Sequence, residues 1–286
     1  MPKRLADFTT DDWLRLRPLT QRLKTLRYDA NNALHIRKLA RGGDVAAVTR
    51  SLTGRRVLIT VAVEDPQAID WQIRLVRRYV ACDLHLIADN SGDDVAASAI
   101  RSASDSAGAL YLRLPASAAR SSRSHGLALN WLWTNVVRPG RPAAFGFLDD
   151  DFFPTGPDDP FAVLGSQEFF GVIRTAGERW FLWAGFCLFH YAAVADRMLD
   201  FRQDWFIGLD TGGANWELLY RHADRMRRRR ADMVTGRYRA DVPESESYFQ
   251  WYNHWLHEVG STGRPDLEAD KRAVVAELLK PHLTGT

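Results

Sequence analysis

One stretch of the sequence decides the fold: Ala144-Phe145-Gly146-Phe147-Leu148-Asp149-Asp150-Asp151-Phe152-Phe153-Pro154. A short apolar run ends there in three consecutive carboxylates, and apolar residues then resume. This pattern indicates a buried strand that carries its carboxyl end to a surface, which is the end where open α/β sheets bind ligands. Adjacent carboxylates repel one another and raise each other's pKa unless a cation is present. The stretch therefore predicts either a site for a hard divalent cation, Mg²⁺ or Mn²⁺, or an acidic turn after a core strand.

Strands and helices alternate ahead of this stretch. The run at 57–63 is continuous, apolar and β-branched, which is typical of a strand buried on both faces of a parallel sheet. Further strands are expected at 84–88 and 109–114, with helices between the strands, the last of them at 124–137. The order predicts an α/β fold, in which helices flank a mostly parallel, Rossmann-like sheet and helical extensions lie at the N- and C-terminal ends.

The second half of the chain is richer in aromatic residues. Two strands are expected at 168–174 and 180–190, followed by a strand-like run at 205–209. A helix is expected from about Gly213 to the basic run at 227–230. An aromatic and His-dense segment at 245–258 and an amphipathic helix from 266 to about 279 complete this half. The basic run is interpreted as a solvated helix end, since cations there favour the helix dipole. A phosphate or nucleic-acid role is the alternative, and it predicts steeply salt-dependent binding.

Residues 1–54 form a predicted helical extension. A helix capped by Asp11 and Asp12 is expected near Trp13, and leucines at helical spacing follow among many basic residues. We expect a helical hairpin packed on the main domain. The alternative is an element that binds a partner or a membrane surface.

Length and composition restrict the class of protein. A chain of 286 residues with 46% apolar and 26% charged residues suits one large globular domain with appendages. Its net charge of +3, with both signs interspersed, does not indicate a nucleic-acid binder. Cys82 and Cys187 lie in apolar runs and predict buried thiols in a reducing compartment, so we expect a cytoplasmic protein. We expect no membrane span and no secretory signal.

Acidic residues follow three of the four expected strands of the parallel sheet. Glu64-Asp65 comes after the first, Asp89 after the second, and the triplet after the fourth. Parallel strands end at one edge of a sheet, so we expect these carboxylates in a single crevice. Arg120 and Arg123 lie just before a helix, where arginines and the helix N-terminus favour phosphate. An exposed loop is the other interpretation of these arginines.

On these residues the chain resembles the glycosyltransferases of the A-type fold, in particular the family 2 group that uses nucleotide sugars. The resemblance covers roughly residues 55–263. It rests on the strand at 57–63, the acidic turn at 88–93, the basic helix start at 122–127 and the D-x-D pattern at 147–151. It implies a transferase domain at 55–265, with a nucleotide-binding half at 55–155 and an acceptor half at 156–265. An extension at 1–54 and a C-terminal helix at 266–286 complete the expected division.

The resemblance also implies roles for single residues. The nucleotide sugar would contact Glu64, Arg120, Arg123 and Asp150, with Asp89 on the base and Asp149 on the ribose. Asp151 would bind Mn²⁺ or Mg²⁺ together with Asp149 and a late histidine, either His257 or His254. Asp210 would be the general base, although Leu209 replaces the first acid of the usual Glu-Asp pair. An N-cap for the following helix is the alternative role of Asp210.

The expected activity is metal-dependent transfer of a sugar from a UDP- or GDP-sugar to a hydroxyl of a saccharide or other acceptor. Trp180, Trp183 and Trp205 are candidates for the acceptor cleft or for the core. A nucleotidyltransferase is one alternative, but the place of its Gly-rich phosphate loop holds Glu64-Asp65-Pro66. A catalytically inactive carbohydrate- or nucleotide-binding protein is another. The donor sugar, the acceptor, the stereochemical outcome and the oligomeric state stay open at this point.

Overall fold

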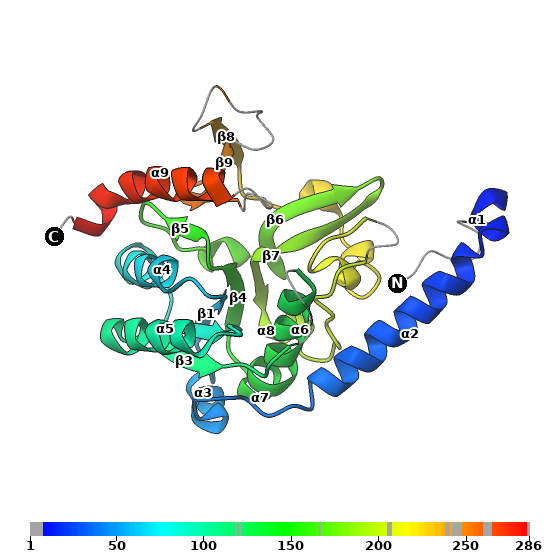
Figure 1. The fold of residues 1–286 in the computed structure, drawn as a ribbon, viewed down its shortest axis with the longest axis horizontal. Coiled ribbons are helices and arrows are strands. Elements are labelled where there is room, and N and C mark those ends of the chain that lie inside the picture. The colour runs from blue at the N-terminus through cyan, green and yellow to red at the C-terminus, as the bar shows by residue number, and fades with distance from the viewer. Residues whose placement is uncertain are drawn as a thin grey trace.

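A six-stranded sheet forms the centre of the computed structural model, which describes residues 8–117, 119, 122–165, 167–204, 208–237, 241, 248–259 and 265–284. Its strand order is β3-β2-β1-β4-β7-β6 (Figure 1). The strands are β1 (Arg56–Ala62), β2 (Leu84–Asp89), β3 (Leu110–Arg113), β4 (Ala144–Asp149), β6 (Phe169–Ala176) and β7 (Arg179–His190). The first four in this order are parallel, and β7 runs antiparallel to both β4 and β6. The predicted α/β class with a mostly parallel sheet is confirmed.

The register brings the acidic strand ends to one edge. Ala62 at the end of β1 is opposite Asp89, and Val61 is opposite Asp149 of β4. The common edge expected from the sequence is therefore present, but Asp89 is completely buried there and does not share an open crevice with Asp151.

Helices cover both faces of the sheet because successive side chains of a strand point to opposite sides. The odd-numbered residues of β1, such as Ile59, pack with α6 (Ser122–Leu132) and the π-helical turn Trp133–Val137 that continues it. Even-numbered residues such as Ala62 pack on α4 (Pro66–Tyr79), beside α5 (Asp94–Ala107). A short α7 (Arg138–Gly140) then leads into β4.

A second, antiparallel sheet follows the acidic triplet and was not expected from the sequence. Its order is β5-β10-β9-β8, with β5 (Phe152–Pro154), β8 (Met233–Arg237), β9 (Tyr248–Tyr252) and β10 (Trp255–His257). Phe152 stacks on Phe186 of the large sheet and on Tyr252 and Trp255 of the small one. The aromatic-dense segment thus forms a hairpin, and its rings join the two sheets.

The prediction of a helix after Gly213 is wrong. The chain there makes only separate 3-10 turns at Gly213–Asn215, Tyr220–His222 and Arg225–Arg227. The buried Asn215 accepts a hydrogen bond from the backbone N–H of Asp200, and Tyr220 packs on Trp180 with ring centroids 5.1 Å apart. These tertiary contacts override the helical spacing. The basic run is accordingly no α-helix end, and its Arg228 pairs with Glu168 at 2.6 Å.

The two extensions are helical, as expected. At the N-terminal end are α1 (Thr10–Leu14), α2 (Arg17–His35) and α3 (Val45–Ser51); at the other end α9 (Pro265–Thr284) packs on α4. The cap of α1 is Thr9, which forms a capping box with Asp12. The predicted packing of the leucine stripe on the main domain is wrong, because α2 extends away from the body with α1 at its far end (Figure 1). Leu19 and Leu23 are 59% and 67% exposed. A short α8 (Tyr191–Val194) follows β7.

Within the described part of the chain, no helix combines the length and the apolar character needed to cross a bilayer.

Candidate active site

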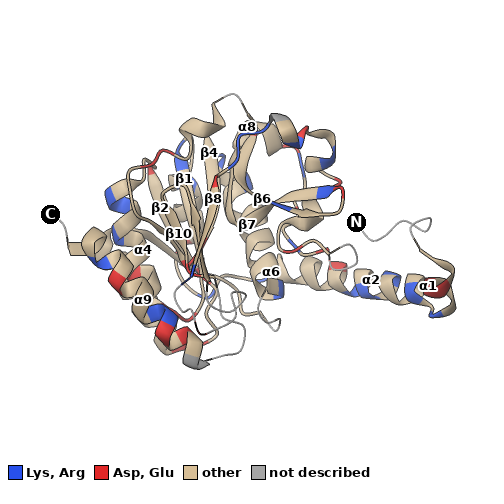
Figure 2. Ribbon diagram, turned by 90° about the horizontal axis from the view of Figure 1, so that it is seen from above, with Lys and Arg blue, Asp and Glu red and all other residues tan. Residues whose placement is uncertain are grey.

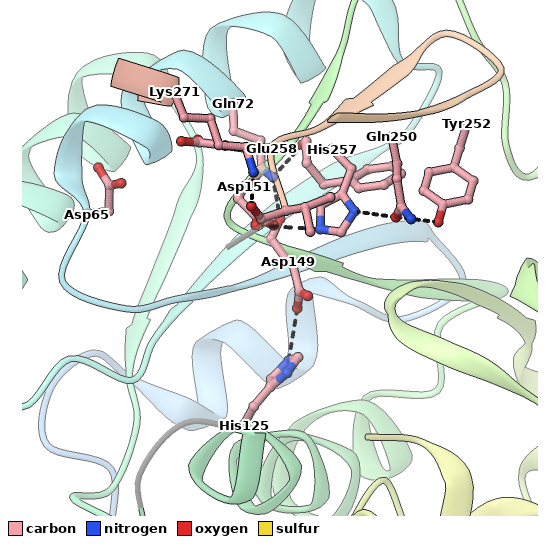
Figure 3. Close-up of polar contacts among 12 residues, drawn as sticks. Asp65, Gln72, His125, Asp149, Asp151, Gln250, Tyr252, His257, Glu258 and Lys271 are labelled. Carbon is pink, nitrogen blue, oxygen red and sulfur yellow. Dashed lines mark hydrogen bonds and ion pairs between the residues drawn. The ribbon is translucent and has the colours of Figure 1, made fainter. Parts of the chain in front are cut away.

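Two elements far apart in sequence hold the backbone of the acidic turn between β4 and β5. The buried Gln72 of α4 donates from Nε2 to the carbonyl oxygens of Asp149 (2.7 Å) and Phe152 (2.8 Å). The N–H of Glu258, just after β10, donates to the carbonyl oxygen of Asp151 at 3.0 Å. Because these bonds engage main-chain groups, the turn is fixed while its carboxylates stay available to other partners (Figure 3).

The carboxylates of Asp149 and Asp150 diverge. Oδ2 of Asp150 accepts from the N–H of Val63 at 2.8 Å, which ties the turn to the end of β1. Oδ1 of Asp149 lies 3.4 Å from Nε2 of His125 on α6 (Figure 3). Burial, and next the charge of Asp151, raises the pKa of Asp149 to about 8 and that of Asp150 well above its ordinary value. Burial lowers the pKa of His125 to about 4. Burial and the charge of Asp151 thus both favour the protonated forms of Asp149 and Asp150.

His257 reaches the turn through the small sheet, because β10 pairs with β5 and sets His257 opposite Phe152. Its Nδ1 lies 3.2 Å from Oε1 of Gln250, which also accepts from the hydroxyl of Tyr252 (2.7 Å) and from Arg174 (3.1 Å). A guanidinium can only donate, so this atom of Gln250 is its oxygen. Nδ1 of His257 consequently carries a proton, and the lone pair of a neutral ring is on Nε2.

Asp151 faces Nε2 of His257. Its Oδ2 lies 3.5 Å from Nε2 of His257, and its buried Oδ1 has no hydrogen-bond partner among the described residues. Burial opposes ionisation, but the charge and hydrogen bond that His257 supplies in its protonated form, and then Arg272, hold the pKa of Asp151 below its ordinary value. A divalent cation that replaced the proton on Nε2 would meet the orphaned oxygen of Asp151 and the lone pair of a neutral imidazole, and both suit such a cation. No group of three or more His, Cys, Asp or Glu residues stands preformed around a metal position in the described ranges.

Hollows lie on both sides of the Asp151–His257 pair. The first, of about 360 Å³, is lined by Asp151 and Glu258 and, from α9, by Lys271 and Arg272. Burial raises the pKa of Glu258 to about 7 despite the neighbouring Arg272. The second, of about 310 Å³, is lined by Arg174, Thr175, Phe181, Trp183, Gly208, Asp210 and His257.

The structure brings Asp210 into the second hollow with His257 and Trp183. Its Oδ1 accepts from Nε2 of Gln203 (2.7 Å) and from the N–H of Thr211 (2.8 Å). The alternative of an α-helix N-cap is wrong, since no α-helix follows. Trp180 is in the core, and Trp183 is also largely buried in the core, at 9% exposed, although it lines this hollow. Trp205 lies outside the described residues.

Asp89 is completely buried behind the loop that follows β2. Its carboxylate accepts from the N–H of Ser91 (2.8 Å) and from the hydroxyl of Tyr111 (2.6 Å). Glu64 is exposed in the adjacent loop, where its own N–H donates to Oγ of Ser91 and its carboxylate accepts from the N–H of Gly92. Asp89 thus holds Ser91, and Ser91 in turn binds the backbone of Glu64. Direct contact of Asp89 or Glu64 with a nucleotide stays a prediction.

The other expected ligands lie elsewhere. Arg123 is exposed over the ring of Tyr28, on the side of α6 opposite His125, because two residues span about 200° of a helix. Its phosphate role stays a prediction. Arg120 lies outside the described residues. His254 is exposed in the turn between β9 and β10, so of the two candidate histidines only His257 borders Asp151.

Three contributors were missed in the sequence: Gln72, His125 and Gln250. Gln72 is a polar residue on the apolar face of α4, and that mismatch was a usable signal. His125 lies in the same segment as the predicted phosphate-binding arginines. An imidazole in the first turn of a helix that follows a strand was a signal that this residue could also lie at the site. No pattern in the sequence pointed to Gln250, because its contact with His257 depends on the register of the β9–β10 hairpin.

No protein-family model and no curated protein matches this chain. Among solved structures it is similar to a mannosyltransferase from Pyrobaculum calidifontis in complex with GDP-Man and Mn²⁺, with 12% identity, a TM-score of 0.40, and coverage of 62% of this chain and 56% of that one. It is also similar to glucosyl-3-phosphoglycerate synthase from Mycobacterium tuberculosis in complex with Mn²⁺, UDP and glucosyl-3-phosphoglycerate, with 16% identity, a TM-score of 0.31, and coverage of 49% and 52%. The chain thus matches about half the length of each. TM-scores below 0.5 assign no function to this chain, which has to be inferred from its own side chains.

Proposed function

We propose that this chain is a metal-dependent glycosyltransferase, which moves a sugar from a nucleoside-diphosphate sugar to a hydroxyl of a saccharide or other acceptor. The observation that carries this proposal is the unpartnered Oδ1 of Asp151 beside the lone pair of His257 Nε2. It stands at the carboxyl edge of the parallel strands, where α/β sheets bind ligands.

Asp149, Asp151 and His257 are the residues that would hold Mn²⁺ or Mg²⁺. When bound, the ion supplies Lewis-acid stabilisation of the departing diphosphate. Gln250 keeps the proton of His257 on Nδ1 and so presents Nε2 for ligation. Gln72 and Glu258 fix the turn that carries both carboxylates.

The second hollow is the proposed acceptor side. Trp183 lines it and is the proposed aromatic contact of the acceptor, although it is only 9% exposed and Arg174 lies over its ring. Asp210 is the proposed general base that removes the proton of the attacking hydroxyl. Gln203 and the backbone of Thr211 both donate to Oδ1 of Asp210. Its other carboxylate oxygen is the one we assign to proton removal.

The test uses the whole chain and the variant Asp151→Asn. Thermal shifts with UDP and GDP, with and without Mn²⁺, measure binding, because a ligand specific for the folded state raises the melting temperature. We expect a Mn²⁺-dependent shift with one of the two nucleotides and Mn²⁺-dependent hydrolysis of the matching nucleotide sugar, with both lost in the variant. Unchanged hydrolysis in a folded variant would refute the metal role, and binding without any turnover would indicate an inactive nucleotide-binding protein instead.

A further inference from the structure

The N-terminal arm, defined here as α1 and α2, presents an apolar stripe that no part of the described chain covers. Leu19, Leu23 and Leu26 are spaced four and three residues apart and are 59%, 67% and 60% exposed. At 100° per residue they lie within about 60° of one another on one side of α2. Leu34 continues the same side at 64% exposed.

The opposite side of α2 attaches the arm to the body. Asn32 pairs with Asn130 of α6 (3.0 Å between Oδ1 and Nδ2), and the ring of Tyr28 lies under Arg123 at 5.2 Å. Tyr28 is about 180° around the helix from Leu19. The body therefore holds the arm by its polar side and directs the leucine stripe outward.

Cations border the stripe. Arg22 and Arg27 are exposed on its two flanks, and the described structure records no acidic partner for either. Lys24 adds one more basic residue, while Arg15 and Arg17 pair with Asp11 and Asp12 at 3.0 and 2.7 Å. No Asp or Glu occurs between residues 13 and 28. Figure 2 shows the basic residues recurring along α2. Trp13, which is 47% exposed, lies at the outer end of the arm.

We infer that the arm docks on an anionic lipid surface. A helix with leucines on one side, flanking arginines and a terminal tryptophan is typical of helices that lie in the plane of a bilayer interface. Arginine side chains extend from the flanks toward lipid head groups while their stems cover apolar surface. In a pair of two such arms, the arginines on the flanks would repel one another, whereas each strengthens binding to anionic lipid. Charge complementarity thus favours a lipid surface over a second copy of this chain.

The experiment measures co-sedimentation of the whole chain with phosphatidylcholine vesicles that contain or lack phosphatidylglycerol. We expect binding to the anionic vesicles and little to the neutral ones. The triple variant Leu19→Gln, Leu23→Gln, Leu26→Gln should lower partitioning at least about a hundredfold, since each leucine loses its burial in the interface. The double variant Arg22→Gln, Arg27→Gln should lower it about thirtyfold and reduce its salt dependence.

The matched control replaces three exposed apolar residues elsewhere, Val95→Gln, Met226→Gln and Val234→Gln, which are 78%, 79% and 65% exposed. The control should sediment like the unaltered chain, and circular dichroism should be the same for all variants. Equal partitioning of the leucine variant and the control would overturn the proposal. A second result would also overturn it: the unaltered chain does not bind vesicles but forms a dimer in solution, and the leucine variant is monomeric. The stripe would then be a contact between two copies of this chain.

Discussion

Nε2 of His257 lies 3.5 Å from Oδ2 of Asp151, and the contact is set by the pairing of β10 with β5. β5 begins at the residue after Asp151, and its first residue is opposite His257. A slip of one residue in this pairing would turn His257 to the other face of the small sheet. The metal proposal therefore depends on one strand register as much as on the acidic triplet.

Replacing Gln250 should weaken metal binding although Gln250 is not a proposed ligand. In Gln250→Leu, Nδ1 of His257 loses its acceptor, and the ring loses its preferred tautomer and orientation. Loss of such a partner typically lowers metal affinity about 10- to 100-fold. Calorimetric titration with Mn²⁺ measures the effect. Gln250→Glu keeps an acceptor oxygen and should retain the affinity, and equal affinities in the two variants would contradict the assigned tautomer.

Replacing Gln72 should destabilise the chain and the site together. Gln72→Leu leaves the buried carbonyl oxygens of Asp149 and Phe152 without their donor, and we expect a loss of about 2–4 kcal/mol in the free energy of unfolding. Urea denaturation measures this loss. The control is Gln67→Leu on the exposed side of the same helix, which should change stability by less than about 0.5 kcal/mol. Similar losses in the two variants would refute the positioning role of Gln72.

Replacing Asp210 should separate binding from transfer. Asp210→Asn removes the proposed base without touching Asp151, so Mn²⁺-dependent binding of the nucleotide should persist. Transfer to the acceptor should fall about 10²- to 10⁴-fold. Thermal shift and a coupled assay for nucleotide release report the two properties. Asp196→Asn, an exposed site in a loop, is the control, and full transfer activity in Asp210→Asn would exclude this residue as the base.

Acid should destabilise the fold through His85. Burial lowers the pKa of His85 to about 4 from an ordinary value of 6.5, and its Nε2 lies 2.9 Å from Oγ1 of Thr60. The unfolded chain binds this proton first as the pH falls, so the contribution to stability is complete above about pH 6.5 and is lost progressively toward pH 4. We expect a loss of about 2–3 kcal/mol over this interval, since one pKa unit corresponds to about 1.4 kcal/mol. Urea denaturation of His85→Gln should show a shallower pH dependence, and parallel profiles would contradict the assignment.

Local pattern determined much of the architecture. Continuous apolar runs predicted β1, β2 and β4 within one residue at most ends, because a strand buried on both faces needs apolar residues at every position. The common edge of the acidic strand ends followed from parallel order alone. The same kind of reasoning failed after Gly213, where Tyr220 and Asn215 are held by distant contacts that spacing along the chain does not encode.

By itself, the sequence determined the α/β order, the edge of the sheet that carries Asp89 and Asp149, and the residue types that suit a divalent cation. Only the tertiary structure decided that His257 and not His254 meets Asp151, that Gln250 sets its tautomer, and that the leucines of α2 face outward. Each of these depends on a strand register or on the face by which a helix is attached. Such choices are made by packing between segments far apart in the chain, which no local pattern of residues specifies.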